Sequence, residues 1–151
     1  MLSKKAKYGI RALIYLAQQP AGAVIIRDIA ERARVPRKFL EAILLELKMA
    51  GLLQSKPGKG GGYHLRLPPD SINLGQVIRS LDGPLAPIPC ASQTAFAPCK
   101  DCPDVQKCVI RSVMRRVRDA TAKIHDQTNL SQLVQEQERL NIPPFDFDFN
   151  I

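Results

Sequence analysis

The sequence contains few of the residues and segments on which enzymes and membrane proteins depend. It has only two histidines, at positions 64 and 125, and neither lies near the cysteines, so we expect surface residues and not metal ligands. No apolar run approaches the roughly 20 residues of a membrane-spanning helix, and the first eight residues lack the apolar core of a signal peptide. No nucleophile and base form a recognisable constellation. We therefore expect a cytoplasmic protein that is neither an enzyme nor inserted in a membrane.

Acidic residues are scarce in the first part of the chain. Residues 1–66 contain 13 lysines and arginines against four acidic residues, whereas residues 67–151 contain nine against ten, so the overall charge of +8 comes from the first part. A basic surface suits a partner with a phosphate backbone, because binding releases condensed counterions. Charge alone leaves open a basic surface that only keeps the protein soluble.

Residues 24–67 are typical of a winged helix-turn-helix. A first helix is expected over residues 27–34, and Pro36 then begins a second helix over residues 37–50. Apolar residues recur in the second helix at the three-and-four spacing of a buried face: Phe39, Leu40, Ile43, Leu44 and Leu47. Its other face is expected to present Arg37, Lys38, Glu41 and Lys48. This pattern predicts a DNA-reading helix.

A β-hairpin is predicted after the second helix. Gly51 ends that helix, residues 52–56 and 63–67 have strand character, and the glycine-rich segment 56–62 forms the tip. Tyr63, Leu65 and Leu67 alternate with polar residues and are expected to face inward. The glycines of the tip allow backbone to approach a partner closely, and its lysines can pair with phosphates.

Three further helices complete the predicted organisation, which is mainly α with a small β-hairpin wing. A helix over residues 3–19 would pack under the helix-turn-helix, and Asn73 with Gln76 resembles a capping box that starts a helix ending at Gly83. The winged domain is therefore expected to span residues 1–83, followed by a loop over 84–103. A helix over 104–129 would be roughly 37 Å long, which is longer than one small winged domain can cover. We therefore expect its apolar stripe to pack against the same helix of a second subunit.

The last segment, residues 130–151, is expected to form a tail. A short polar helix is predicted over residues 130–139, and phenylalanine alternates with aspartate from Pro143 onward. That alternation is a strand pattern without an evident partner, so docking on a neighbour and disorder both remain open.

Four cysteines lie between positions 90 and 108, with the spacing Cys90-x8-Cys99-x2-Cys102-x5-Cys108. Cytoplasmic thiols are kept reduced, so this crowding favours a metal site over disulfides. Four thiolates suit either zinc or an iron–sulphur cluster. The short Cys-x2-Cys pair favours zinc slightly. The position of the loop, beside a DNA-reading domain and a dimer helix, instead favours a labile cluster whose loss can shift the DNA-reading elements.

The residues taken together resemble the Rrf2 family of bacterial winged-helix regulators. The likeness rests on Tyr8-Gly-Ile-Arg-Ala-Leu, Val35-Pro-Arg-Lys-Phe-Leu-Glu41, Gly51-Leu-Leu, Gly60-Gly-Gly-Tyr63, Gly75-Gln-Val-Ile78 and the Cys102-x5-Cys108 pair. It covers residues 1 to about 125 and implies a homodimer that binds a near-palindromic operator, usually as a repressor, with cluster state tuning affinity. Glu41 matches a glutamate that reads bases in the regulator of iron–sulphur cluster assembly.

The sequence departs from the family at the cluster ligands. Members commonly use three cysteines and complete the site with a histidine three residues after the last one, or with an aspartate near the N-terminus. Those positions hold Arg111 and Lys7 here, neither of which is a normal ligand, while Cys99 offers a fourth thiolate. The resemblance therefore implies an all-cysteine site, with a 2Fe-2S cluster expected ahead of 4Fe-4S or zinc.

These observations predict a homodimeric DNA-binding regulator that senses iron or redox state. The alternatives are a zinc-stabilised or cluster-free regulator of the same fold, and a cluster-carrying electron-transfer or scaffold protein whose basic face docks an acidic partner. On the first hypothesis the expected contacts to double-stranded operator DNA are Lys4, Lys5, Arg27, Arg37, Lys38, Glu41, Lys48, Lys56, Lys59, Gly60 and Gly61.

Overall fold

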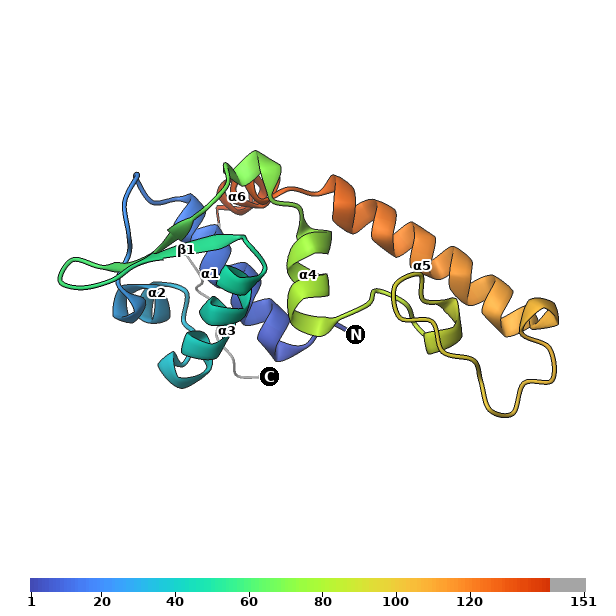
Figure 1. Cartoon of the computed structure of the whole chain (residues 1–151). Coiled ribbons are helices and arrows are strands. Elements are labelled where there is room, and N and C mark those ends of the chain that lie inside the picture. Colours follow the sequence, from blue (N-terminus) through green and yellow to red (C-terminus); the bar gives the residue numbers. More distant parts are fainter. Residues whose placement is uncertain (142–151) are drawn as a thin grey trace.

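A computed structural model describes residues 1–141, and the phenylalanine–aspartate segment beyond Pro143 lies outside the described residues. The shorter helices form a body with a two-stranded hairpin at one side, and helix α5 extends away from this body (Figure 1). No helix within residues 1–141 is long and apolar enough to cross a membrane. The elements are α1 (Lys4–Ala17), α2 (Ile26–Arg32), α3 (Arg37–Met49), β1 (Leu53–Lys56), β2 (Gly62–Leu65), α4 (Leu74–Asp82), α5 (Val109–Gln127) and α6 (Leu130–Arg139).

Helix α1 is the centre of the core, because α2, α3, α4, α6 and β2 all contact it. It begins at Lys4, and the side chain of the preceding Ser3 caps the helix by accepting from the Ala6 amide. At Gly9 it passes so close to its neighbours that an added Cβ would collide with Leu81 of α4. The largest fully buried side chains are Leu13, Ile29, Leu40, Ile43, Leu44, Leu47, Leu53 and Ile72. These residues hold the helix-turn-helix in place.

The helix-turn-helix lies within two residues of its predicted bounds. Arg34 adopts a left-handed conformation with φ of 49°, and Val35 is buried in the turn between α2 and α3. The prediction that Phe39 is buried was wrong, since its side chain is 56% exposed. The buried face of α3 is centred on Leu40, Leu44 and Leu47, and Phe39 lies about 100° around the helix from Leu40, so it falls beyond the edge of the core.

Strands β1 and β2 form the antiparallel hairpin, with Leu53 opposite Leu65 and Lys56 opposite Gly62. A bridge between Val24 and Tyr63 joins the hairpin to the segment before α2. Gly62 has a φ of 150° and lies against the Val24 carbonyl, where a Cβ would collide. The prediction that Leu67 faces inward was wrong, because β2 ends at Leu65 and Leu67 is exposed.

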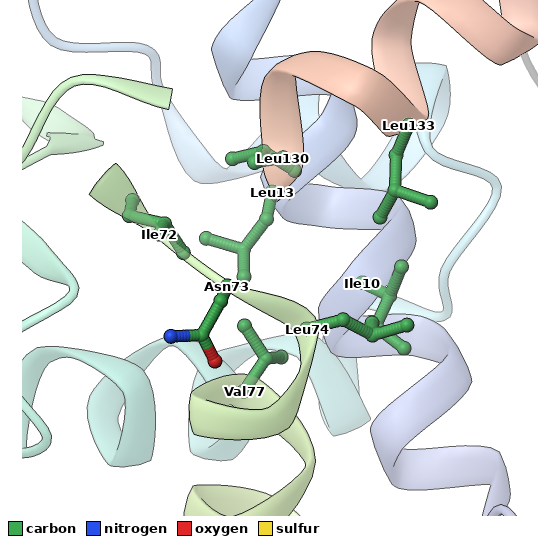
Figure 2. Close-up of a pocket in the computed structure, with 8 residues that line it drawn as sticks. All are labelled: Ile10, Leu13, Ile72, Asn73, Leu74, Val77, Leu130 and Leu133. Atoms are coloured by element: carbon green, nitrogen blue, oxygen red, sulfur yellow. The ribbon is translucent and has the colours of Figure 1, made fainter. Parts of the chain in front are cut away.

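The predicted capping box at the start of α4 is present: Asn73 Oδ1 accepts from the Gln76 amide and the Gln76 side chain accepts from the Asn73 amide. Helix α6, predicted as a short polar helix, begins with a second capping box at Asn129. It folds back onto α1 and brings Leu130 and Leu133 toward Ile10, as Figure 2 shows. The segment after α5 therefore contributes to the core of the winged body.

Helix α5 is shorter than predicted. The Asp104 side chain accepts from the Gln106 amide and caps a separate 3-10 turn, Val105–Lys107, and Cys108 then adopts an extended conformation. The helix therefore starts at Val109 with Cys108 as its N-cap, and the prediction that Cys108 lies on its first turns was wrong. Its 19 residues span about 28 Å instead of 37 Å.

The described chain covers little of the apolar side of α5. Val109, Ile110, Val113, Val117 and Ile124 are between 43% and 78% exposed, and only Arg118 is buried. The C-terminal end of α5 is anchored to the body, because the two terminal guanidinium nitrogens of Arg79 in α4 donate to the Asp126 carboxylate at 2.6 and 2.9 Å. The N-terminal end lies at the far side of the molecule, beside the cysteine loop (Figure 1).

Candidate nucleic-acid interface and cysteine site

The outer side of α3 carries charged groups on its first turns. Arg37, Lys38 and Glu41 are exposed, as predicted from the sequence pattern. Arg37 Nε lies 3.3 Å from Glu41 Oε1, one helical turn away. A pair so exposed contributes little to stability, so both groups can exchange partners when a ligand approaches. The arrangement offers one hydrogen-bond acceptor and two cations to a surface facing α3.

Two lysines predicted to contact DNA are held by partners within the chain. Lys5 of α1 pairs with Glu46 of α3 at 3.0 Å, and Lys48 donates to Ser55 of β1 at 2.7 Å. These bonds join α3 to α1 on one side and to the hairpin on the other. Lys5 and Lys48 therefore help to fix the direction of α3. Lys4 and Arg27 are exposed, and Arg27 lies 3.6 Å from Asp28.

The tip of the hairpin is a tight glycine turn. Lys56, Lys59 and Gly60 are exposed, whereas Gly61 is buried and donates its amide to the Gly58 carbonyl at 3.0 Å. An added Cβ at Gly61 would collide with the Lys56 carbonyl, so the turn itself requires this glycine. The two lysines and the exposed backbone of Gly60 are presented together.

The structure brings the four cysteines together at one pocket. Cys90 comes from a 3-10 turn, Pro89–Ala91, Cys99 and Cys102 from the following loop, and Cys108 from the N-cap of α5. None forms a disulfide, and Ile88, Pro103, Val105 and Ile110 supply apolar walls. The Cys90 thiol lies near Cys99, and the Cys102 thiol lies near both Cys108 and Cys90. In the described part of the chain, no three Cys, His, Asp or Glu side chains gather as the site of a single ion.

The surroundings of the thiols differ in their effect on ionisation. The backbone N–H of Arg111 lies 3.5 Å from the Cys108 sulphur and lowers the pKa of that thiol. Charge on the adjacent Cys90 raises the pKa of Cys99, and removal from water raises the pKa of Cys102. Cys108 is therefore the thiol whose surroundings favour the thiolate, as expected at the N-terminus of a helix.

Two arginines hold the Cys90 turn against α5. Arg111 Nε donates to the Cys90 carbonyl at 2.8 Å, and Arg118, seven residues further along, donates to the Ala91 carbonyl. Arg118 is 8% exposed and also pairs with Asp119. Sequence reasoning considered Arg111 only as a poor ligand and missed Arg118. Their spacing places both on one face of α5. Their partners are backbone carbonyls, which every residue carries, so the sequence gives no sign of these contacts.

The comparisons with known proteins identify the family of the chain. The model of the Rrf2 family, described as an iron-dependent transcriptional regulator, matches residues 2–136. The chain belongs to the Rrf2 family. A putative HTH-type transcriptional regulator, rrf2-like, from Rhodobacter capsulatus is 41% identical over 121 residues, which are 78% of this chain and 81% of the relative. The HTH-type transcriptional regulator IscR of Aliivibrio salmonicida is 29% identical over 138 residues, 91% of this chain and 79% of the relative.

Solved structures of Rrf2 proteins share the fold. CymR, the global cysteine regulator of B. subtilis, aligns with a TM-score of 0.72 at 31% identity, covering 90% of this chain and 97% of that one. IscR of T. potens aligns with a TM-score of 0.72 at 29% identity, covering 94% and 91%. The predicted family and winged-helix fold are therefore confirmed. This Rrf2 protein is a transcriptional regulator and not an enzyme.

Proposed function

We propose that a homodimer of this chain binds operator DNA as a repressor and that an iron–sulphur cluster on its four cysteines sets its affinity. One observation carries the proposal. Cysteines from a turn, a loop and the cap of α5 converge on one pocket, and the other end of the same helix is ion-paired to α4 of the winged body. A change at the pocket can thus reach the DNA-reading elements through a single rigid helix.

The DNA-reading half of the proposal rests on α3 and the hairpin tip. With α3 in the major groove, the Glu41 carboxylate can accept from a cytosine amino group, while Arg37 and Lys38 contact bases or phosphates. Lys56, Lys59 and the exposed backbone of Gly60 would contact phosphates or the minor groove beside it. Lys4 and Arg27 are further exposed cations on the same basic half of the chain.

The exposed apolar side of α5 supports a dimer. Five large apolar side chains follow one another along the helix and stay at least 43% exposed in the described chain. A second α5 packed against them would remove this surface from water. A two-fold axis would also give two α3 helices for an operator with two half-sites about one helical turn apart. The test is sedimentation of the wild type against Val113→Glu, which should remain monomeric.

The cysteine pocket fits a cluster by its donors. Four thiols line one pocket between apolar walls, and the Arg111 amide offers a hydrogen bond to the Cys108 sulphur. All three candidate groups accept four thiolates, and we propose 2Fe-2S ahead of 4Fe-4S and zinc; no three of the four thiols gather as the site of a single ion in the described residues, which weighs against zinc. Such a cluster, when bound, supplies one-electron chemistry and sensitivity to oxygen, nitric oxide and iron supply.

The chain's own residues would transmit the state of the pocket. Arg111 and Arg118 tie the Cys90 turn to α5, and Cys108 is the N-cap of that helix. Without a common ligand the four thiols would be free to separate, and the N-terminal end of α5 could move. The Arg79–Asp126 pair and the bond from the Leu74 amide to the Thr128 carbonyl connect the opposite end to α4.

Metal analysis of protein purified without oxygen tests the cofactor. Wild type should contain iron and acid-labile sulphide in equal amounts with a visible absorption band, and Cys102→Ala should lose both. Ser112→Ala, an exposed position one turn into α5, is the matched control and should keep both. Stoichiometric zinc without sulphide in the wild type would refute the cluster and leave a structural metal site in a DNA-binding regulator.

A further inference from the structure

Helix α3 has a second apolar side that faces away from the core. Phe39 is 56% exposed, Leu45 is 50% exposed and Met49 is 80% exposed, and Ala42 between them is exposed as well. These positions are three or four residues apart along the helix and form a stripe on its outer surface. The core-facing positions of α3 are different ones, so the stripe has no role in folding the described chain.

Charged side chains surround the first turns of this stripe. Arg37 and Lys38 precede Phe39 and are exposed, and Glu41 lies beside Ala42. The stripe and these charges therefore form one surface. An occupant must offer negative charge close to small apolar groups.

DNA meets both requirements in its major groove. Phosphates line the groove edges, and on the base edges the only apolar group is the C5-methyl of thymine, which Ala, Thr and Phe side chains are known to contact. Guanine, cytosine and adenine present only hydrogen-bonding groups there. Recognition helices of helix-turn-helix proteins enter this groove, their N-terminal residues nearest the bases.

We propose that Phe39 and Leu45 contact thymine methyl groups and thereby select operators with thymines at two defined positions in each half-site. The inference rests on the proposed binding of α3 in the major groove. Six residues separate the two side chains, which is about 9 Å along the helix axis. At 3.4 Å per base pair this corresponds to thymines two to three base pairs apart. Glu41 reads a polar base edge beside them.

The test replaces single thymines by uracil, which removes only the methyl group. The probe is a duplex that the full-length protein itself selects from a random pool, and affinity is measured for each thymine-to-uracil duplex. At two positions per half-site the wild type should bind about fourfold more weakly, the factor expected for one buried methyl group. Phe39→Ala should abolish the difference at one position and Leu45→Ala at the other, because a removed contact no longer senses the methyl.

Met49→Ala is the matched control. Met49 is on the same stripe and more exposed, but it is the last residue of α3, about 15 Å from Phe39. This variant should keep the wild-type ratio between thymine and uracil duplexes. All three side chains are exposed and alanine favours helices, so circular dichroism should show the wild-type fold.

Three results would overturn the inference. The first is that the wild type binds every uracil duplex within twofold of the parent duplex but still binds DNA in a salt-dependent, sequence-selective manner. This result would refute the methyl contacts and leave the proposed DNA binding standing. The second is a loss of affinity in Phe39→Ala and Leu45→Ala with the uracil ratios unchanged. The third is unaltered DNA binding by both variants with a changed oligomeric state, which would make the stripe a protein contact. A wild type that selects no duplex would refute the proposed function and this inference together.

Discussion

Replacing Arg118 should release the Cys90 turn from α5. Arg118→Met keeps the aliphatic stem of the side chain but removes the bond to the Ala91 carbonyl and leaves that acceptor beneath the helix. A hydrogen bond to a charged group is worth about 1.5–3 kcal/mol. Since 1.4 kcal/mol is a factor of ten, local opening of the turn should become roughly ten- to a hundredfold more frequent.

The thiol of Cys90 reports this opening, because it is only 4% exposed while the turn is in place. In metal-free, reduced protein a thiol reagent followed by peptide mass analysis should label Cys90 faster in the variant by that factor. Cys99, already exposed, should be labelled at an unchanged rate. Arg115→Met, an exposed neighbour on α5, is the control and should leave Cys90 protected. Equal labelling of Cys90 in wild type and Arg118→Met would refute the role assigned to Arg118.

Three further substitutions test other parts of the structure. The guanidinium of Arg79 lowers the pKa of Asp126, so the pair stabilises the fold above the carboxyl's ordinary pKa and loses its effect as the pH falls through the lowered value. Asp126→Asn should therefore cost at most about 1 kcal/mol at pH 7 in denaturant unfolding, a difference that vanishes in acid. Gly62→Ala should lower stability by about 1–3 kcal/mol, measured by thermal unfolding, because of the left-handed φ and the nearby carbonyl. Lys59→Ala should weaken binding to all duplexes and reduce the salt slope by about one, whereas Glu41→Ala should relax sequence preference; equal effects of both on selected and random duplexes would contradict this division.

Local sequence signals predicted much of the fold. The capping box at Asn73 needs only a side chain and an amide three residues apart, and the apolar spacing of α3 identified four of its five proposed core residues. Phe39 was misplaced because periodicity does not show how wide the buried face is. Only packing against α1 and α2 determines that width.

The site was less accessible to sequence reasoning. The spacing of the cysteines was enough to predict that they gather, and the structure places all four at one pocket. The break before α5 was missed because the Asp104 cap competes with an apolar pattern that continues through Val105. The hydrogen bond from Arg118 to the Ala91 carbonyl depends on the path of the cysteine loop, and that path could not be predicted because the loop sequence has no periodicity.

The affinity of one preparation for one duplex, measured with and without the cluster, tests the central claim most directly. Protein purified without oxygen is divided, one half is stripped of metal under reducing conditions, and both halves are titrated against the self-selected duplex at fixed salt. We expect the two dissociation constants to differ by at least about fivefold, the lower range of allosteric coupling. Cys102→Ala should bind the duplex with the same dissociation constant before and after metal removal. Equal affinities of the loaded and stripped wild type would contradict the claim that the cysteine site controls DNA binding.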